Sequence, residues 1–247
     1  MATKSSSTNA ERAADILVVL GVAPDEGLSL SEIAARVGGA KPAAHRTLVA
    51  LGSRGLVQPG TRKGFYRLGP ALYALARSGN TAAAVARWKP ALVGVAARTG
   101  HSTYLLARAG LDAVCLDVET GPGPIQTLTS GVGGRVPLGL GPGSLAILSV
   151  LPPSLQDTLL AANAERFRQD GRISADGVRM ALARMAKTGI AIDEGALIPG
   201  VAGLATGIVD PLLGPVAISQ ALPAASLTAE TQESFRLAVA DLSPASP

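Results

Sequence analysis

Apolar residues recur at helical spacing over the first eighty positions, and polar or glycine-rich boundaries separate the runs. The pattern predicts helices over residues 11–20, 30–37, 42–54 and 70–78. Ser29, followed three residues later by Glu32, fits a capping box that would begin the second helix. Gly38 and Gly39 favour its end, and Pro42 suits the first turn of the third helix. A tight turn is therefore expected between the second and third helices.

Two short runs of strand-forming residues follow the third helix, at Leu56–Gln58 and Phe65–Leu68. The loop between them, residues 59–64, contains turn-forming Pro and Gly and carries Arg62 and Lys63 at its tip. Helix, tight turn, helix and two-stranded hairpin, in this order, predict a winged helix-turn-helix. That module binds DNA.

The second part of the chain mixes strand and helix patterns and predicts an α+β domain, with an antiparallel sheet flanked by helices. Strands are expected over residues 103–108, 113–118, 125–129, 190–192, 201–209 and 214–220. Helices are expected over residues 81–98, bent or split near Pro90, and over 144–150, 155–163, 175–187 and 227–241. The expected domains are a disordered tail (1–9), a winged helix-turn-helix (10–79), a linker helix (80–98) and a sensor-like domain (99–247).

Charge is divided unevenly between these parts. Residues 1–79 hold ten Lys and Arg against five Asp and Glu, whereas residues 80–247 hold twelve against thirteen. From Ile33 to Leu111 the chain has twelve cations and no acidic residue. Soluble domains normally mix both signs, so a basic surface on a helix-turn-helix favours double-stranded DNA as the partner. A basic face without a partner is the alternative.

The third helix has an apolar face and a polar face. Ala44, Leu48 and Leu51 share one side and are expected to pack inward, so the opposite side is free for the major groove. Arg46 is the candidate for a base-edge contact, because arginine can bond guanine through two hydrogen bonds. The candidate DNA-binding residues are Lys41, Pro42, Ala43, His45, Arg46, Arg54, Arg62 and Lys63.

These candidates have different expected roles. Lys41, near the start of the helix, and Arg54, after it, are candidates for phosphate contacts. Arg62 and Lys63 at the wing tip would enter the minor groove or rest on the DNA backbone. His45 lies on the flank, where a packing or capping role is the alternative to DNA contact.

Composition argues against several other functions. The chain is 47% apolar and 3% aromatic, so it can bury a core but offers few rings for stacking single-stranded bases. Its single cysteine, Cys115, excludes an intrachain disulfide and lies in an apolar run, which favours a buried strand residue. With only two histidines, His45 and His101, and neither a Walker loop nor a G-x-S-x-G elbow, we expect no enzyme, no cofactor and no metal.

The chain also lacks the marks of a membrane or secreted protein. No uninterrupted apolar run is long enough to span a bilayer, and the polar N-terminus lacks the apolar core of a signal peptide. A cytoplasmic protein without a membrane partner is expected.

Three segments of the first eighty residues resemble, in order and spacing, the bacterial transcription regulators of the isocitrate lyase regulator (IclR) family. They are LSLSEIAARVG, KPAAHRTLVALGSRGLV and GFYRLGPALYAL. The pair His45-Arg46 and the YRLG of Tyr66–Gly69 are their most specific parts. Weaker collinear matches follow in STYLLARAGLDAVCL, RVPLGLGPGSLAIL, GIAIDEGALIPGVAGLATGIVD and GPVAISQ.

The resemblance implies a GAF-like C-terminal domain that binds a small-molecule effector, and a homo-oligomer, dimer or tetramer, whose DNA binding that effector controls. The effector would be a carboxylate or an apolar metabolite. The loop 139–144 opens a helix whose free N–H groups favour an anion, and an ordinary glycine-rich turn is the alternative. The implied effector-binding residues are Tyr104, Gly139, Leu140, Gly143, Ser144, Asp193, Leu204, Ala205 and Ser219.

Three positions depart from the family's pattern. Gly139 stands where a histidine is usual, Ser144 where a lysine is usual and Gly207 where a proline is common. We therefore expect a sequence-specific transcription regulator, repressor or activator, that is modulated by an effector of altered specificity. The alternative is a ligand-independent regulator with a degenerate pocket. A metabolic enzyme with a fused DNA-binding domain is a third class, and the missing catalytic residues argue against it.

Overall fold

The computed structural model describes residues 8–78, 81–125, 131–240 and 242. The chain divides into two compact units, residues 1–80 (unit 1) and 81–247 (unit 2). Most of the expected tail (1–7), the expected boundary at 79–80 and most of the expected strand 125–129 lie outside the described residues.

Unit 1 is a winged helix-turn-helix. Its elements are α1 (Thr8–Gly21), β1 (Leu28–Ser29), α2 (Leu30–Arg36), α3 (Lys41–Gly52), β2 (Val57–Pro59), β3 (Phe65–Leu68) and α4 (Ala71–Ser78). The strands form an antiparallel sheet in the order β1-β3-β2, in which β1 was not expected. The tail prediction is wrong at Thr8 and Asn9, which form the first turn of α1.

The core of unit 1 comes from the apolar positions that share helical spacing. Ile16 and Leu20 of α1 pack with Ile33 of α2, Leu48 of α3 and Val57 of β2. All five side chains are buried, so the three helices and the wing close on one small core.

The expected capping box starts α2. Ser29 Oγ accepts a hydrogen bond from the N–H of Glu32 at 3.3 Å, and the Ser29 N–H donates to Glu32 Oε2 at 2.8 Å. The Ser29 hydroxyl also donates to Glu32, and these hydrogen bonds from Ser29 lower the pKa of the carboxyl. The box therefore fixes where the helix-turn-helix begins.

Unit 2 is an α+β domain built on one antiparallel sheet, in the order β6-β5-β4-β9-β8-β7. Its strands are β4 (Thr103–Ala109), β5 (Asp112–Glu119), β6 (Arg135–Pro137), β7 (Ala191–Ile198), β8 (Val201–Asp210) and β9 (Gly214–Pro223). Its helices are α5 (Thr81–Thr99), α6 (Pro142–Ser149), α7 (Pro153–Asp170), α8 (Ala175–Thr188) and α9 (Ala229–Val239), with a short 3-10 turn at Ala224–Ser226.

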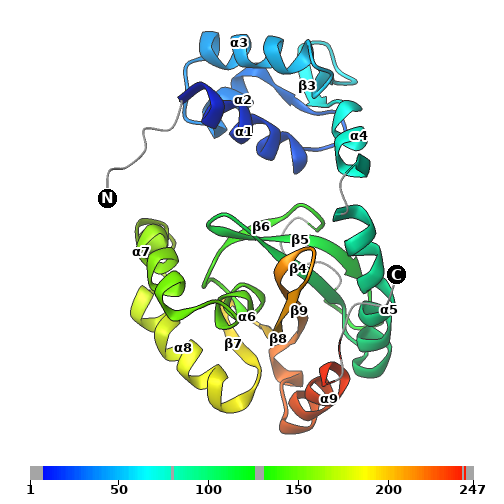
Figure 1. Ribbon diagram of the computed structural model, residues 1–247, viewed down its shortest axis with the longest axis vertical. Coiled ribbons are helices and arrows are strands. Elements are labelled where there is room, and N and C mark those ends of the chain that lie inside the picture. Colours follow the sequence, from blue (N-terminus) through cyan, green and yellow to red (C-terminus); the bar gives the residue numbers. More distant parts are fainter. Residues whose placement is uncertain (1–7, 79–80, 126–130, 241, 243–247) are drawn as a thin grey trace. The chain divides into compact units, whose positions relative to one another are not determined.

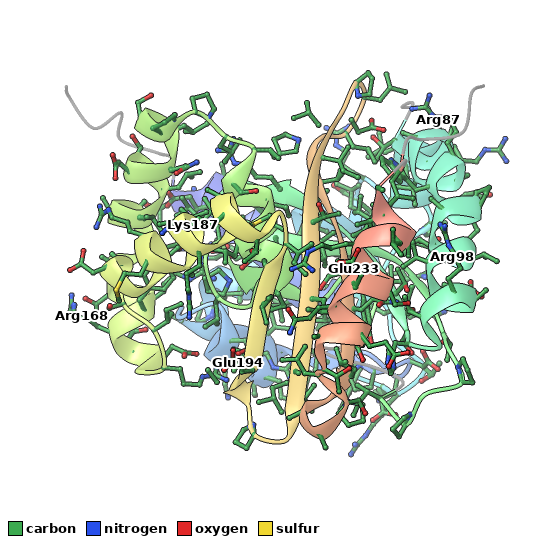
Figure 2. The ribbon with its side chains drawn as sticks, turned by 90° about the horizontal axis from the view of Figure 1, so that it is seen from below. Arg87, Arg98, Arg168, Lys187, Glu194 and Glu233 are labelled. Atoms are coloured by element: carbon green, nitrogen blue, oxygen red, sulfur yellow. The ribbon has the colours of Figure 1, made fainter. Side chains whose placement is uncertain are left out.

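Helices cover both faces of this sheet (Figure 1). Helices α6, α7 and α8 pack on one face, where Ile147, Leu160 and Val178 are buried. Helices α5 and α9 pack on the other, through Trp88 and Phe235. Arg98 of α5, labelled in Figure 2, donates from Nη2 to the carbonyl of Ala238 at 2.8 Å and joins these two helices. Each sheet face therefore has its own core.

The structure corrects two expectations about α5. The helix runs without a break through Pro90, where a bend or split was expected. It is also not a separate linker, because Trp88, Leu92 and Val95 are fully buried in the core of unit 2. Strand β6, at the edge of the sheet, was not expected from the sequence.

A buried carboxylate joins α5 to the turn between β8 and β9. Asp210 Oδ2 accepts a hydrogen bond from Trp88 Nε1 at 3.0 Å, and Oδ1 accepts from the N–H groups of Leu212 and Leu213 at 2.8 and 2.7 Å. Burial raises the pKa of Asp210, but these donors and the nearby Arg87 guanidinium outweigh burial and lower it overall. Asp210 is therefore expected to be ionised in the folded state.

Candidate nucleic-acid interface and ligand pocket

Helix α3 presents the two faces that the sequence predicts. Ala44, Leu48 and Leu51 are buried in the core of unit 1. On the outer side His45 and Arg46 are exposed, as are Lys41 and Pro42 in the first turn, whereas Ala43 is half-buried. The outer side of α3 is thus a polar, cationic surface on a rigid helix, as a groove-reading helix requires.

The wing adds two exposed cations, Arg62 and Lys63, in the loop between β2 and β3. The Arg62 guanidinium carbon lies 4.8 Å from the centroid of the Phe65 ring, which steadies the loop through a cation–π contact. Among the described residues of unit 1, no Lys or Arg forms an ion pair. Their charges are therefore not neutralised within the unit.

Arg54 follows α3 and is also exposed. With Arg46 it borders a surface hollow between α1 and α3, which Arg12 also lines. Arg12 was not among the expected DNA contacts, because nothing in the sequence shows which side of α1 meets α3. Three guanidinium groups therefore border one surface hollow.

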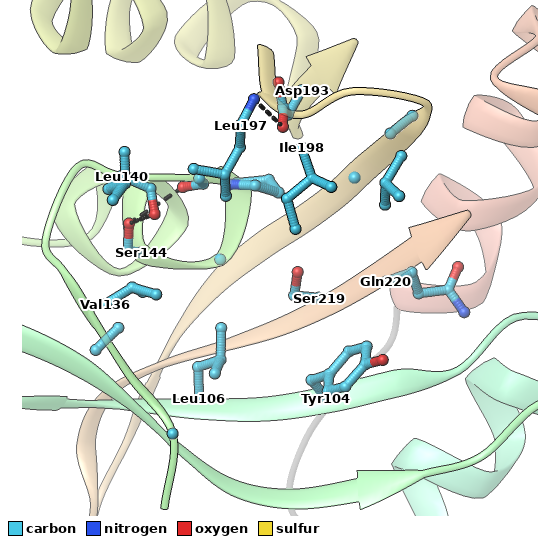
Figure 3. Close-up of a pocket in the computed structure, with 18 residues that line it drawn as sticks. Tyr104, Leu106, Val136, Leu140, Ser144, Asp193, Leu197, Ile198, Ser219 and Gln220 are labelled. Atoms are coloured by element: carbon cyan, nitrogen blue, oxygen red, sulfur yellow. Dashed lines mark hydrogen bonds between the residues drawn. The ribbon is translucent and has the colours of Figure 1, made fainter. Parts of the chain in front are cut away.

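In unit 2, a pocket of about 640 Å³, including its open mouth, lies between the sheet and the start of α6 (Figure 3). Six of the nine expected effector-binding residues line it, namely Tyr104, Leu140, Gly143, Ser144, Asp193 and Ser219. They come from β4, the loop before α6, α6 itself, β7 and β9. The tertiary fold thus brings together positions that are widely separated in the sequence.

The other three expected residues do not line this pocket. Gly139 borders a second hollow on the far side of the loop, beside α8. Leu204 belongs to the core under α5 and α9, because alternate residues of β8 face opposite sides of the sheet. Ala205 faces the α6 side but is fully buried in the core there.

Several apolar lining residues were not expected. Leu106, Val136, Leu197 and Ile198 supply much of the wall. The alternation of strand side chains could have identified Leu106, since it lies two residues after Tyr104 on the same strand. Val136, Leu197 and Ile198 could not be found in this way, because the order of the strands in the sheet decides that they reach the pocket wall.

Two glycines let α6 approach the sheet closely. A Cβ at Gly143 would lie 2.1 Å from Leu106 Cδ1, and one at Gly203 would lie 2.6 Å from Pro142 Cγ. No side chain fits at either position without displacing its neighbour. The inner wall of the pocket therefore requires these glycines.

The loop before α6 is held by hydrogen bonds at both ends. Ser144 Oγ donates to the carbonyl of Leu140 at 2.8 Å and accepts from the N–H of Gly139 at 3.1 Å. At the other end the carbonyl of Leu111 accepts from the N–H of Leu138 at 3.0 Å. Ser144 therefore has a structural role in the loop, whatever its role toward a ligand.

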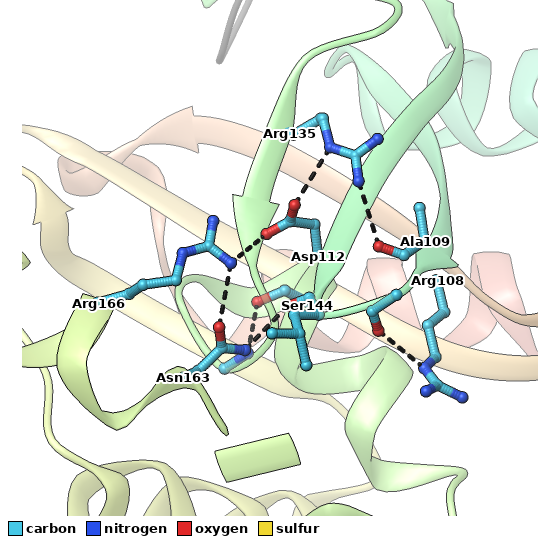
Figure 4. Close-up of polar contacts among 10 residues, drawn as sticks. Arg108, Ala109, Asp112, Arg135, Ser144, Asn163 and Arg166 are labelled. Atoms are coloured by element: carbon cyan, nitrogen blue, oxygen red, sulfur yellow. Dashed lines mark hydrogen bonds and ion pairs between the residues drawn. The ribbon is translucent and has the colours of Figure 1, made fainter. Parts of the chain in front are cut away.

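A polar network anchors the same loop to α7 and the β4–β5 turn (Figure 4). Asn163 of α7 donates to the Leu111 carbonyl at 2.9 Å. Asp112 pairs with Arg135 of β6 at 3.2 Å and with Arg166 of α7 at 2.6 Å. The network fixes the edge of the sheet from which the pocket loop departs.

Two polar side chains of the pocket are held by hydrogen bonds to the backbone. The Asp193 carboxylate accepts from the N–H groups of Ala196 and Leu197 at 2.9 and 3.3 Å, and Ser219 Oγ donates to the Leu204 carbonyl at 3.2 Å. Within the described part of the chain, no group of His, Cys, Asp and Glu residues could hold a metal ion. Cys115 is buried, and burial raises the pKa of its thiol to about 11.

Comparison with known proteins identifies the module in unit 1. Residues 9–60 match the sequence model of the IclR helix-turn-helix domain. The transcriptional regulator Rv1719 of Mycobacterium tuberculosis is 29% identical over 213 residues, which are 86% of this chain and 81% of that protein. Unit 1 therefore contains a helix-turn-helix domain of the IclR type, and the chain is similar to transcriptional regulators over most of its length.

Two further proteins are similar to this chain over most of its length. The transcriptional regulator TtgV of Pseudomonas putida is 29% identical over 214 residues, covering 86% of this chain and 80% of its own. An IclR family regulator from Brucella abortus has the same fold, with a TM-score of 0.74 at 20% identity over 100% of this chain and 95% of its own.

A second solved structure was determined with a ligand. It is an IclR homologue from Microbacterium hydrocarbonoxydans complexed with 4-hydroxybenzoate, with a TM-score of 0.71 at 20% identity, covering 94% of this chain and 96% of its own. None of the helices in the described part of our chain is long and apolar enough to cross a membrane.

Proposed function

We propose that this chain binds specific DNA sequences and that a small molecule in the pocket of unit 2 changes its affinity for them. The observation that carries the proposal is the outer face of α3 and the wing, where exposed cations have no ion-pair partner among the described residues of unit 1. Phosphate neutralisation is the general use of such a surface.

Within this proposal the cations have separate roles. Arg46, on the outer face of α3, reads a base edge in the major groove. Lys41 and Arg54 contact phosphates, and Arg62 and Lys63 of the wing contact the DNA backbone or minor groove. Pro42, Ala43 and His45 complete the surface of α3 that faces the groove.

We also infer a homodimer or tetramer. Helix-turn-helix proteins commonly read two half-sites about one helical turn apart, which requires two copies of the reading helix. We infer that the chain regulates transcription without catalysing a reaction, since its relatives are transcriptional regulators.

The test is selection from a pool of random duplexes, followed by fluorescence anisotropy on the enriched sequence and on a scrambled version. We expect binding of the enriched sequence to be about 10³-fold tighter or more at physiological salt. Arg46→Ala should reduce that preference. The matched control Arg168→Ala removes one exposed cation from α7 in unit 2 and should leave it unchanged. A pool without enrichment would contradict sequence-specific binding.

The second candidate is a ligand-independent regulator. The lining of the pocket favours it, because Leu106 lies so close to Gly143 that there is no space for a Cβ between them. The two candidates differ in one measurement, the affinity for the enriched duplex with and without a compound that stabilises the chain to heat. An affinity that no stabilising compound changes would favour the ligand-independent regulator.

A further inference from the structure

The pocket in unit 2 has an unusual charge composition for a site that would take a carboxylate. No lysine, arginine or histidine occurs among its described lining residues, and the one acidic residue is Asp193. A buried anion without a countercharge is costly, so a carboxylate ligand would find no compensating group among these side chains.

The start of α6 is the remaining place where an anion could bind. Pro142 has no N–H, and the N–H of Leu145 donates to the Gly141 carbonyl at 3.1 Å, which leaves the N–H groups of Gly143 and Ser144 without acceptors among the described residues. Asp193 lines the same pocket, where its carboxylate accepts hydrogen bonds from the N–H groups of Ala196 and Leu197. A second carboxylate there would meet like charge.

Two further polar side chains line the pocket, Ser219 and Gln220, and neither offers a donor to a ligand. Ser219 Oγ donates its hydrogen to the Leu204 carbonyl, so only lone pairs remain for a ligand. The Gln220 side chain points away from the pocket, and its amide donates to Thr103 Oγ1 at 2.8 Å (Figure 3). A ligand therefore needs a donor for Asp193 or Ser219 and an acceptor for the N–H groups of α6.

We propose that the effector of this chain is an uncharged, largely apolar molecule with a primary amide, a group that both donates and accepts hydrogen bonds, and that Asp193 excludes carboxylates. This inference rests on the proposed function, because it assigns a ligand class to the same pocket. It narrows the choice between a carboxylate and an apolar metabolite that the sequence leaves open.

The experiment compares matched probes on the full chain by thermal unfolding and calorimetric titration. Benzamide and benzoate have the same size and differ in charge, as do hexanamide and hexanoate. We expect at least one amide to raise the unfolding temperature, and its carboxylate to bind about tenfold more weakly or worse. Val136→Phe, which fills the pocket, should abolish amide binding.

Asp193→Asn tests the cause of the discrimination. It removes the charge but keeps an oxygen for the N–H groups of Ala196 and Leu197, so the preference for amide over carboxylate should shrink. Glu194→Gln removes the neighbouring negative charge, which does not line the pocket, and should leave the preference unchanged.

The outcomes separate this inference from the proposed function. Carboxylates that bind as tightly as their amides would overturn the ligand class and leave an effector site in place. Binding by none of the four probes would overturn the ligand class, while the duplex selection would still test DNA recognition on its own. A preference unchanged in Asp193→Asn would overturn the role of Asp193, and this holds even if Val136→Phe does not fold.

Discussion

At the scale of single residues, Arg46 and Lys63 illustrate how two exposed cations of one unit serve different purposes. Arg46 stands on a helix, which holds its guanidinium in a defined direction. Lys63 lies in the loop between β2 and β3, where its ammonium acts as a mobile point charge. We therefore expect Arg46 to discriminate between bases and both cations to neutralise phosphate.

This difference predicts distinct mutant behaviour. Arg46→Ala should cost about 1–3 kcal/mol of binding free energy on the selected duplex and relax the base preference at one position. Lys63→Ala should weaken binding to all DNA sequences alike. It should also lower the slope of log affinity against log salt concentration by about one. Anisotropy titrations over a salt series check both. Equal loss on specific and scrambled DNA in Arg46→Ala would refute the role given to Arg46.

Asp210 is a residue whose removal should cost considerable stability. Its removal leaves Trp88 Nε1 and two backbone N–H groups without their buried acceptor, and each such loss costs about 1–3 kcal/mol. Asp210→Ala should therefore lower the free energy of unfolding by about 3 kcal/mol or more in denaturant titrations near neutral pH. Asp157→Ala, at an exposed carboxylate, is the control and should change it little.

The same residue predicts a pH dependence. The pKa of Asp210 is lower in the folded than in the unfolded state, so its stabilisation is fully present above the unfolded pKa. It is lost as pH falls through the folded pKa, below about pH 4. The difference in unfolding free energy between the native chain and Asp210→Ala should be constant from pH 6 to 8 and shrink in acid.

At the scale of elements, local signals decided where the helices of unit 1 begin. Ser29→Ala removes the hydroxyl that caps α2 and should destabilise unit 1 by about 1 kcal/mol. Ser31→Ala, an exposed position on the same helix, is the matched control and should have a smaller effect. Thermal unfolding measures both. An equal effect of the two substitutions would argue against the capping box as the stabilising feature.

The elements also show where local signals fail. Pro90 predicts an interruption, yet α5 continues because Trp88, Leu92 and Val95 bury its face in the core. Strand β6 has only three residues, too few for a periodic pattern, and exists because it pairs with β5. Tertiary packing stabilises the secondary structure of α5 around Pro90 and of β6, where local sequence preferences alone do not.

At the scale of the whole molecule, each unit has a separate apolar core. We therefore expect two unfolding transitions in calorimetry. Leu48→Ala, in the core of unit 1, should lower one transition by several degrees, and Leu148→Ala, in the core of unit 2, should lower the other. A single transition that both substitutions shift equally would contradict independent cores.

The candidate sites differ in how far the sequence predicted them. The proposed DNA-facing residues lie on α3, in the segment after it and in the wing, so their spacing along the chain was enough to nominate them. The pocket draws on all six strands of the sheet, β4 to β9, and six of the nine residues that the family resemblance implied line it. Leu204 faces the opposite side of the sheet and Ala205 is buried in the core, and only the tertiary fold shows either fact.

The sequence by itself determined the winged helix-turn-helix, its capping box, its inward positions and its excess of positive charge. These follow from interactions between residues a few positions apart, and such interactions appear in the sequence as regular spacings of residue types. Only the tertiary structure decided that α5 belongs to unit 2, that glycines bring α6 against the sheet, and that Asp193 is the one acidic residue lining the described pocket. Those features depend on contacts between segments that are distant in the sequence. Strand pairing and burial establish these contacts, and no local sequence pattern predicts them.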